Sequence, residues 1–324
     1  MAGGREPPAG REAVTRPQAP PGPRPRAGGR LLEHVPCNHC GHDVTHGVRN
    51  VSRLVRCVNC GLIFVNPRPP FEELARQYEG SYFNCPEPTF GGYEDYDADR
   101  EDIARTFRRR MKLIRPRVGP AAPRVLDVGC ATGIFLEVAR EAGWQAEGLD
   151  ISRYALERAR HRGFEVHEGT LTGAGLAAGR YDVITLWDLI EHVPDPAAVL
   201  AECHRLLRPG GLLALSTPDA GSVPARLLGG RWLGFRSIDE HLYFFSRRTM
   251  GAMLGAAGLE VHHMVPVGKV IALPRLIERL RFYTRIGALL LRTVDRVVPK
   301  LSFYVNPRDT MLVLAAKPAG VPPA

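Results

Sequence analysis

Three side chains that can bind a metal ion or carry a proton lie close together at Asp188, Glu191 and His192. They directly follow residues 181–187, "YDVITLW", whose apolar and β-branched residues predict a buried strand. A second histidine, His241, lies in the aromatic stretch "RSIDEHLYFFS". A histidine in such a place can act as a general base toward an alcohol or phenol. We therefore expect His192 and His241 to be catalytic; for His241, a structural role that pins its loop is the alternative.

A glycine loop lies upstream of this cluster. In "LDVGCATG", Gly129 and Gly133 come directly after a predicted strand and before a predicted helix. Small residues there let the backbone approach a ligand closely, at the carboxyl ends of the strands where open α/β sheets bind ligands. Asp150 ends the next predicted strand, where a carboxylate can accept hydrogen bonds from two ribose hydroxyls. Together these residues predict a site for a cofactor that contains a nucleoside.

The spacing of the loop excludes two common cofactor sites. A dinucleotide site requires Gly-x-Gly-x-x-Gly, and a phosphate-binding P-loop requires Gly-Lys-Ser/Thr. The pattern here is Asp-x-Gly-x-x-x-Gly, with Asp127 at its start and Ala131 inside it. A carboxylate in the loop favours a cationic ligand without phosphate. S-adenosylmethionine, an adenosine with a sulfonium and an amino-acid tail, fits these requirements.

Four of the seven cysteines form two Cys-x-x-Cys pairs separated by 16 residues. They are Cys37, Cys40, Cys57 and Cys60. Four thiolates at this spacing can close a tetrahedral zinc site in a zinc ribbon, and in a cytosolic chain such pairs indicate a metal rather than disulfides. Because four protein ligands leave no coordination position for water, we expect a structural zinc ion.

The order of the predicted elements indicates the fold class. Strands are predicted at 124–129, 144–150, 164–169, 181–187, 212–217, 259–266 and 309–318, and helices at 98–115, 134–143, 152–163, 195–211 and 246–257. This alternation predicts parallel βαβ units and a doubly wound, Rossmann-like α/β fold with a seven-stranded sheet. We expect residues 1–30 to be a disordered Pro/Arg/Gly-rich tail, 31–66 a zinc ribbon, 67–118 a connecting segment with a helix, and 119–324 the catalytic domain with an insert at 219–245.

The net charge of +9 is unevenly distributed. Residues 1–30 carry +4 and residues 261–324 carry +7, which leaves −2 for 31–260. A protein that grips a phosphate backbone usually has a basic face on its folded domain, so a nucleic-acid partner is not expected.

For the basic stretch 274–298 we expect a lid or packing role, with peripheral membrane contact as the alternative. The sequence has no secretory signal and no apolar run of the roughly 18 residues that span a bilayer, so we expect a cytoplasmic location.

Four stretches in this order resemble the successive motifs of class I S-adenosylmethionine-dependent methyltransferases, nearest to the ubiquinone-biosynthesis O-methyltransferase group. They are "RVLDVGCATGIFL", "GLDIS", "YDVITLWDLIEHVPDP" and "LLRPGGLLALSTPD". The resemblance implies a cofactor site in which a methionine pocket is shaped by Asp127, Gly129, Cys130 and Gly133, the ribose is held by Asp150 with Ile151 beside the adenine, and Trp187 lines the pocket. It also implies that an arginine among Arg108–Arg110 reaches the cofactor carboxylate, and we choose Arg109.

The same resemblance raises a second metal site. Asp188, Glu191 and His192 match an acid-x-x-acid-His pattern that is associated with a divalent ion in some members of that group, although Asp stands here where those members have Glu. We treat a Mg²⁺ site at these residues as the alternative to a base. The ribbon also resembles modules of some ribosomal-RNA methyltransferases and deoxysugar C-methyltransferases.

The function that these features predict is methyl transfer from S-adenosylmethionine to a small-molecule or glycan acceptor, at oxygen. The alternatives are a deoxysugar C-methyltransferase, an RNA methyltransferase that grips RNA with its ribbon, and a binding protein with a vestigial fold. The sequence does not name the acceptor or the oligomeric state.

Overall fold

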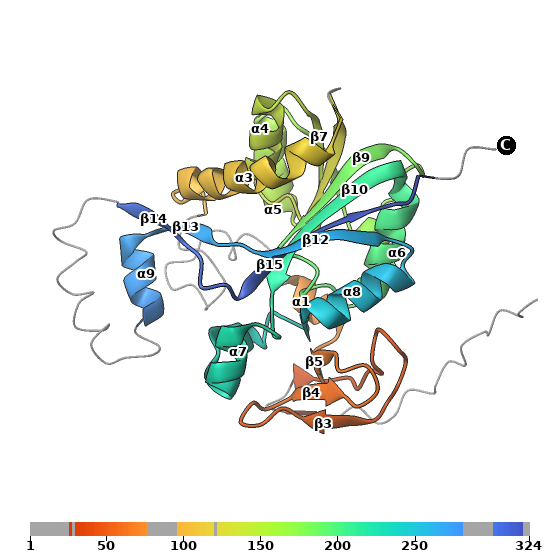
Figure 1. The fold of residues 1–324 in the computed structure, drawn as a ribbon, viewed down its shortest axis with the longest axis vertical. Helices are drawn as coiled ribbons and strands as arrows, with labels where there is room; N and C mark the ends of the chain where they lie inside the picture. Colours follow the sequence, from red (N-terminus) through yellow and green to blue (C-terminus); the bar gives the residue numbers. More distant parts are fainter. Residues whose placement is uncertain (1–25, 28–29, 77–95, 120–121, 281–300, 320–324) are drawn as a thin grey trace, which may run out of the picture.

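A seven-stranded sheet forms the centre of the protein in the computed structural model, which describes residues 26–27, 30–76, 96–119, 122–280 and 301–319 (Figure 1). Its strands are β6 (Arg124–Val128), β7 (Gln145–Asp150), β8 (Glu165–Glu168), β9 (Tyr181–Trp187), β10 (Leu207–Pro218), β12 (Glu260–Pro266) and β15 (Thr310–Ala316). The strand order is β12-β15-β10-β9-β6-β7-β8. β10, β9, β6, β7 and β8 are parallel, and β15 is antiparallel to both of its neighbours. The predicted Rossmann-like sheet of seven strands is therefore confirmed.

Helices cover both faces of this sheet. They are α3 (Arg100–Ile114), α4 (Ile134–Glu141), α5 (Arg153–His161), α6 (Pro196–Leu206) and α8 (Arg247–Ala256). Successive residues of a strand point to opposite faces, so Val183 packs in the cluster with α3 and α4 while Ile184 packs in the cluster with α6 and α8. Both side chains are fully buried, as parallel strands require.

Local sequence accounts for most helix boundaries. Ser152 caps α5 by accepting a hydrogen bond from the amide of Ala155. The helix predicted over 195–211 ends earlier, at Leu206. The reason is that Leu207 already pairs with Tyr181 in the large sheet, and Pro209 has no amide hydrogen with which to continue the helix.

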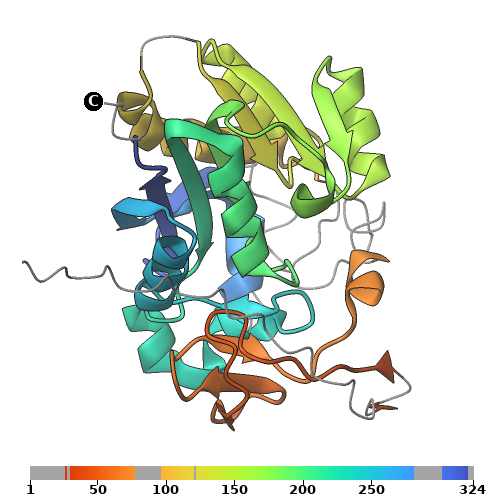
Figure 2. The same ribbon diagram turned by 90° about the vertical axis from the view of Figure 1, so that its right-hand side faces the viewer.

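The cysteine-rich segment forms a second, four-stranded sheet together with a strand of the insert. This sheet has the order β11-β5-β4-β3 and consists of β3 (Thr45–Gly47), β4 (Leu54–Cys57), β5 (Ile63–Val65) and β11 (Tyr243–Phe244). Residues 31–66, called the ribbon from here on, lie beside α7 (Val223–Leu228) and α8 in both views (Figure 1, Figure 2). The sequence did not predict that the ribbon and the insert share a sheet.

A hairpin of β13 (Lys269–Ala272) and β14 (Ser302–Val305) was also not predicted. β13 is fixed to α3 by a hydrogen bond from the amide of Val270 to Oγ1 of Thr106. It leads into α9 (Leu273–Leu280), which is the start of the predicted helical stretch 274–298. The remainder of that stretch, residues 281–298, the first 25 residues of the predicted tail, and Cys85 lie outside the described residues.

The smaller elements are α1 (Phe71–Ala75) and the two-residue strands β1 (Arg26–Ala27) and β2 (Arg30–Leu31). Short 3-10 turns lie at Arg115–Arg117, Leu171–Gly173, Gly229–Arg231 and Leu233–Ser237. Among the described residues, no helix has the length and apolar character needed to cross a bilayer.

Candidate functional site

A large cavity opens at the carboxyl ends of β6, β7 and β9, and the insert and the β13–β14 hairpin form its other walls. Its volume is about 1370 Å³. Pockets for a single small ligand measure about 300–1,000 Å³, so this cavity has room for a donor and an acceptor together. The predicted site residues in its wall are Gly129, Asp150, Ile151, Trp187, Asp188, His192 and His241.

The glycine loop and Asp150 form one end of the cavity. Gly129 has a φ of 74°, a left-handed conformation that favours glycine. The Asp150 carboxylate accepts hydrogen bonds from the amides of Ala131 and Ser152, each at 2.9 Å. Burial raises the pKa of Asp150, although these amides oppose the shift. The two amides hold the carboxylate in one orientation at the edge of the cavity, where lone pairs remain for a ligand.

Three predicted cofactor residues lie outside the cavity wall. Asp127 is buried beneath the loop, where its carboxyl accepts a hydrogen bond from Thr185 at 2.6 Å, and burial raises its pKa to about 8. Cys130 packs in a core cluster with its thiol against Gly148. Gly133 is the N-cap of α4 and has a φ of 87°. These residues lie next to the loop but are not part of the lining of the large cavity.

Arg109, which was expected to reach the cofactor carboxylate, does not line the large cavity, whereas its neighbour Arg110 does. The guanidinium of Arg109 stacks on the ring of Tyr304, 4.5 Å from its centroid, and lies outside the large cavity. Arg110 lines the cavity, is 3% exposed, and packs over the ring of Trp187 at 5.1 Å. Its Nε and Nη2 atoms have no hydrogen-bond partner among the described residues. Neighbouring helical residues point about 100° apart, so only one of the two can face the site.

His192 and His241 meet on the opposite side of the cavity. Their rings are perpendicular, with centroids 4.6 Å apart. His192 Nδ1 lies 3.0 Å from the carbonyl oxygen of Glu240. Because a carbonyl only accepts, Nδ1 carries the proton and Nε2 keeps its lone pair. Burial lowers the pKa of His192 to about 4 and holds the pKa of His241 well below its usual range, so both rings are neutral at neutral pH.

Asp188 is held by two cations. Its Oδ2 lies 2.8 Å from Nζ of Lys269 and 3.6 Å from Nη2 of Arg110, and its Oδ1 accepts a hydrogen bond from Ser216 at 3.0 Å. Burial opposes ionisation of Asp188, but the charges of Lys269 and Arg110 outweigh it and keep its pKa below the usual range. Asp188 is therefore an ionised carboxylate whose charge is already compensated.

The acids of the alternative Mg²⁺ site at Asp188, Glu191 and His192 have different surroundings. Asp188 is neutralised by Lys269 and Arg110. Burial and the nearby charge of Asp188 raise the pKa of Glu191 to about 8, so Glu191 is largely protonated at neutral pH. The ligand atoms that do lie within 4.8 Å of one another belong to Glu191, His192 and His241, without Asp188. The two carboxylates that were expected to share an ion therefore have different environments and different charges.

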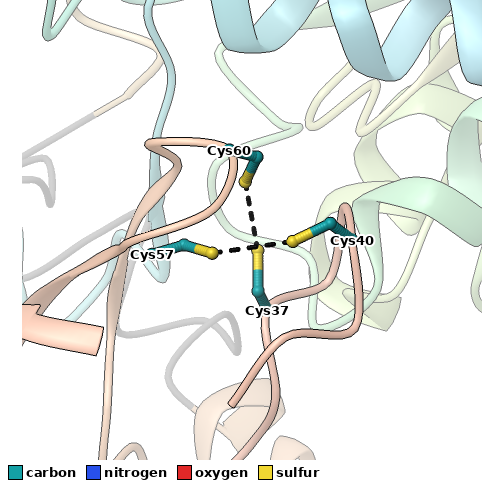
Figure 3. A group of neighbouring side chains, drawn as sticks. All are labelled: Cys37, Cys40, Cys57 and Cys60. Carbon is teal, nitrogen blue, oxygen red and sulfur yellow. Dashed lines mark hydrogen bonds between the residues drawn. The ribbon is translucent and has the colours of Figure 1, made fainter. Parts of the chain in front are cut away.

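The four cysteines of the ribbon converge on one point (Figure 3). All four Sγ atoms lie within 4.8 Å of one another, with Cys37 and Cys60 at 3.5 Å and Cys40 and Cys57 at 3.6 Å. A zinc ion with four Zn–S bonds of about 2.3 Å requires sulfur atoms about 3.8 Å apart, so the geometry fits.

The two turns that present the cysteines are alike. The amides of Gly41 and Gly61 donate to the carbonyls of Cys37 and Cys57, and both glycines have positive φ values, 71° and 83°. Each turn therefore uses a glycine where the backbone is left-handed, as two equivalent metal knuckles require.

Two site residues were missed by the sequence reasoning. Arg110 could have been chosen over Arg109, because it shares the buried face of α3 with Phe107, Met111 and Ile114. Lys269 carried no such signal, since it lies on a short strand whose partner is far along the chain. Its place in the cavity depends on tertiary packing.

Comparison with known proteins gives consistent matches. A family described as a methyltransferase domain matches residues 96–264. The ubiquinone biosynthesis O-methyltransferase of Pseudomonas aeruginosa is 33% identical over 168 residues, which cover 48% of this chain and 72% of that protein. The protein of the same name from Aromatoleum aromaticum is 40% identical, with the same coverage.

Solved structures are similar in fold. A chain in the complex between the Haloferax volcanii Trm112 methyltransferase activator and a methyltransferase has a TM-score of 0.50 and 19% identity. The match covers 68% of the present chain and 94% of that one. The family match begins at residue 96, so the ribbon lies outside it.

Proposed function

Because the chain belongs to the methyltransferase domain family and uses S-adenosylmethionine as methyl donor, we propose that it methylates a hydroxyl oxygen of a small-molecule or glycan acceptor. The observation that carries this proposal is the neutral histidine pair, which lines the same cavity as Gly129 and Asp150. Both relatives described above are named O-methyltransferases, which supports oxygen as the acceptor atom.

We assign the donor end of the cavity to the cofactor. Asp150 would hold the ribose hydroxyls, Ile151 would lie beside the adenine, and the Gly129 backbone would approach the methionine part closely. Nε of Arg110 makes no hydrogen bond to the described residues, and Nη2 has the 3.6 Å ionic contact with Asp188, so the guanidinium keeps donors that the cofactor carboxylate would satisfy. When bound, the cofactor supplies a methyl group on a cationic sulfur.

The chain's part in the transfer is to orient the acceptor and remove its proton. The lone pair of His192 Nε2 would take the hydroxyl proton as the acceptor oxygen bonds to the methyl carbon. The methyl group would come from the cationic sulfur of the donor, which would keep the bonding electrons and so become a neutral thioether. Lys269, fixed by Asp188, adds positive charge that favours the developing oxyanion.

Replacing His192 tests this role. We expect His192→Gln to lower kcat by about 10²- to 10⁴-fold, as the loss of a general base does, while S-adenosylhomocysteine binds as before. Transfer of a tritiated methyl group to a panel of phenols and sugars measures the rate, and calorimetry measures the binding. His167→Gln, on β8 and away from the cavity, is the matched control. An unchanged rate in His192→Gln would exclude this histidine as the base.

Two adjacent arginines provide a matched pair for the donor site. We expect Arg110→Met to weaken binding of S-adenosylhomocysteine by about 10- to 150-fold, since a hydrogen bond to a charged group contributes about 1.5–3 kcal/mol. Arg109→Met removes the same charge from the next position and should bind within about threefold of the wild type. Calorimetry distinguishes the two. Equal losses would show that both changes act through α3, against a direct contact of Arg110.

We also propose that Cys37, Cys40, Cys57 and Cys60 bind one structural zinc ion. The convergence of their sulfur atoms and the two glycine turns support it. With four protein ligands, such an ion has no open position for a substrate, so its contribution would be to the stability of the ribbon.

A further inference from the structure

Among the parts of the chain that the ribbon contacts are the two segments that carry the histidine pair. These segments are the loop after β9 (188–195) and the part of the insert at 237–245. We propose that Arg68 and Asn38 are positioning residues, which fix these two segments to each other and to the ribbon and so set the place of His192 and His241 in the cavity. Only the catalytic role of the histidines rests on the proposed function; the positioning itself does not.

Arg68 joins three segments through one buried guanidinium. Its Nη1 donates to the carbonyl oxygen of Pro194 at 3.1 Å and to the Tyr243 hydroxyl at 2.9 Å. Its Nε lies 3.2 Å from the Glu33 carboxylate. The Tyr243 hydroxyl in turn donates to the same Pro194 oxygen at 3.0 Å. Arg68 is only 8% exposed, and a buried charge is stable only where its partners are in place, so the guanidinium fixes the relative positions of these segments.

Asn38 makes the second connection from inside the first cysteine turn, between Cys37 and Cys40. Its Nδ2 donates to Oδ1 of Asp195 at 2.8 Å, and its Oδ1 accepts from the amide of Ala197 at 2.9 Å. Asp195 is itself the N-cap of α6. Asn38 therefore completes the cap of the helix at which the loop after β9 ends.

The backbone carries this constraint to the histidines. The amides of Leu242 and Tyr243 both donate to the carbonyl oxygen of Glu191, at 2.8 and 3.2 Å. The carbonyl of Leu242 accepts from the amide of Val65 in the ribbon at 2.9 Å. With the bond from His192 to Glu240, the loop, the insert and the ribbon form one hydrogen-bonded unit.

The same contacts cover one face of the ribbon, the segment that the sequence analysis considered as a module that could grip RNA. The turn with Asn38 and the strand that leads to Arg68 face the chain's own loop and insert, and Phe64 of β5 pairs with Tyr243. This face is therefore occupied within the chain. Figure 2 shows the orange ribbon against the teal insert.

Amide hydrogen exchange of the full-length protein tests the proposal without an acceptor. In Arg68→Met we expect peptides from 188–197 and 237–245 to exchange about tenfold faster or more. The reason is that local opening of these segments no longer has to break the hydrogen bonds of the Arg68 guanidinium. Exchange in 124–150, the affinity for S-adenosylhomocysteine and the metal content should stay as in the wild type. Asn38→Ala should accelerate exchange in 188–197 in the same way. Arg68→Lys, which keeps the charge but can make fewer of the bonds, should be intermediate.

Arg53→Met is the matched control. Arg53 also reaches from the ribbon to the insert, with Nη2 2.6 Å from Asp239, but both side chains are partly exposed, so its loss should leave exchange unchanged. A second readout is the pKa of His192, followed by NMR of carbon-labelled histidine and assigned with His192→Gln. It should rise toward 6.5 in Arg68→Met, as water reaches the ring.

The positioning role would be overturned if both segments of Arg68→Met exchanged at the wild-type rate. It would also be overturned if exchange accelerated equally over the whole chain. The expected exchange pattern together with an unchanged rate in His192→Gln would overturn the proposed base and leave the positioning role standing.

Discussion

Asp150→Ala is expected to weaken the binding of S-adenosylhomocysteine by at least about 100-fold. The carboxylate would accept hydrogen bonds from two ribose hydroxyls, and each bond to a charged group contributes about 1.5–3 kcal/mol. The same carboxylate orders the loop through the amides of Ala131 and Ser152. The variant therefore loses both the ligand contact and the shape of the loop. Titration calorimetry measures the affinity, and circular dichroism shows that the variant is folded.

Asp182→Ala is the control for this result. Asp182 also accepts a hydrogen bond from a backbone amide, that of Arg124 at 2.8 Å, and it pairs with Arg208, but it lies at the start of β9, far from the cavity. Its loss should lower the stability and leave the affinity within about twofold. Asp150→Asn, which keeps one oxygen and loses the charge, should be intermediate. A folded Asp150→Ala protein that binds as tightly as the wild type would remove Asp150 from the donor site.

Loss of the metal is expected to have the largest effect on stability. Plasma mass spectrometry should find one zinc ion per chain, and Cys57→Ser should lack it and unfold at least about 5 °C lower. Structural zinc contributes about 10–16 kcal/mol to the folding of isolated zinc fingers, and the core of this protein includes Cys37, Cys57, Leu62 and Phe64 of the ribbon. Disruption of the ribbon therefore exposes part of the main core.

Cys203→Ala separates zinc binding from the mere loss of a buried thiol. Cys203 is fully buried on α6 and lies outside the cysteine cluster. The variant should lose some stability through the space left in the core, but it should keep its zinc. Wild-type protein that is produced with added zinc and contains none would show that the four thiols serve another purpose.

The central fold could be predicted because its elements have strong local signals. Val183 and Ile184 belong to a run that only a strand buried on both faces explains, and Ser152 marks the start of α5 through its own side chain. The donor end of the cavity follows from the same signals, since Gly129 and Asp150 lie where two parallel strands end. Residues whose position depends on strand ends and helix caps can therefore be placed from the sequence.

The sequence indicated both histidines but not the contacts around them, because distant segments build this side of the cavity. Lys269 reaches Asp188 only through a hairpin whose second strand begins at Ser302. His241 meets His192 because β11 joins the ribbon, and no periodicity of the sequence indicates that pairing. The Mg²⁺ alternative at Asp188, Glu191 and His192 stays a prediction. It considered the acids without Lys269 and Arg110, which compensate Asp188.

The pairing of β11 with β5 also sets an order of events during synthesis. The two cysteine turns are close in sequence, so they can come together on metal as soon as Cys60 has emerged. The fourth strand of their sheet, Tyr243–Phe244, leaves the ribosome only after most of the large sheet has been made. Until then Ile63 and Phe64 have an unpaired strand edge and an uncovered apolar surface, which in a growing chain favours association with other chains. The pairing of β11 with β5 is thus the last step in completing the four-stranded sheet. Because His241 lies two residues before β11, we expect the same late step to bring His241 to His192.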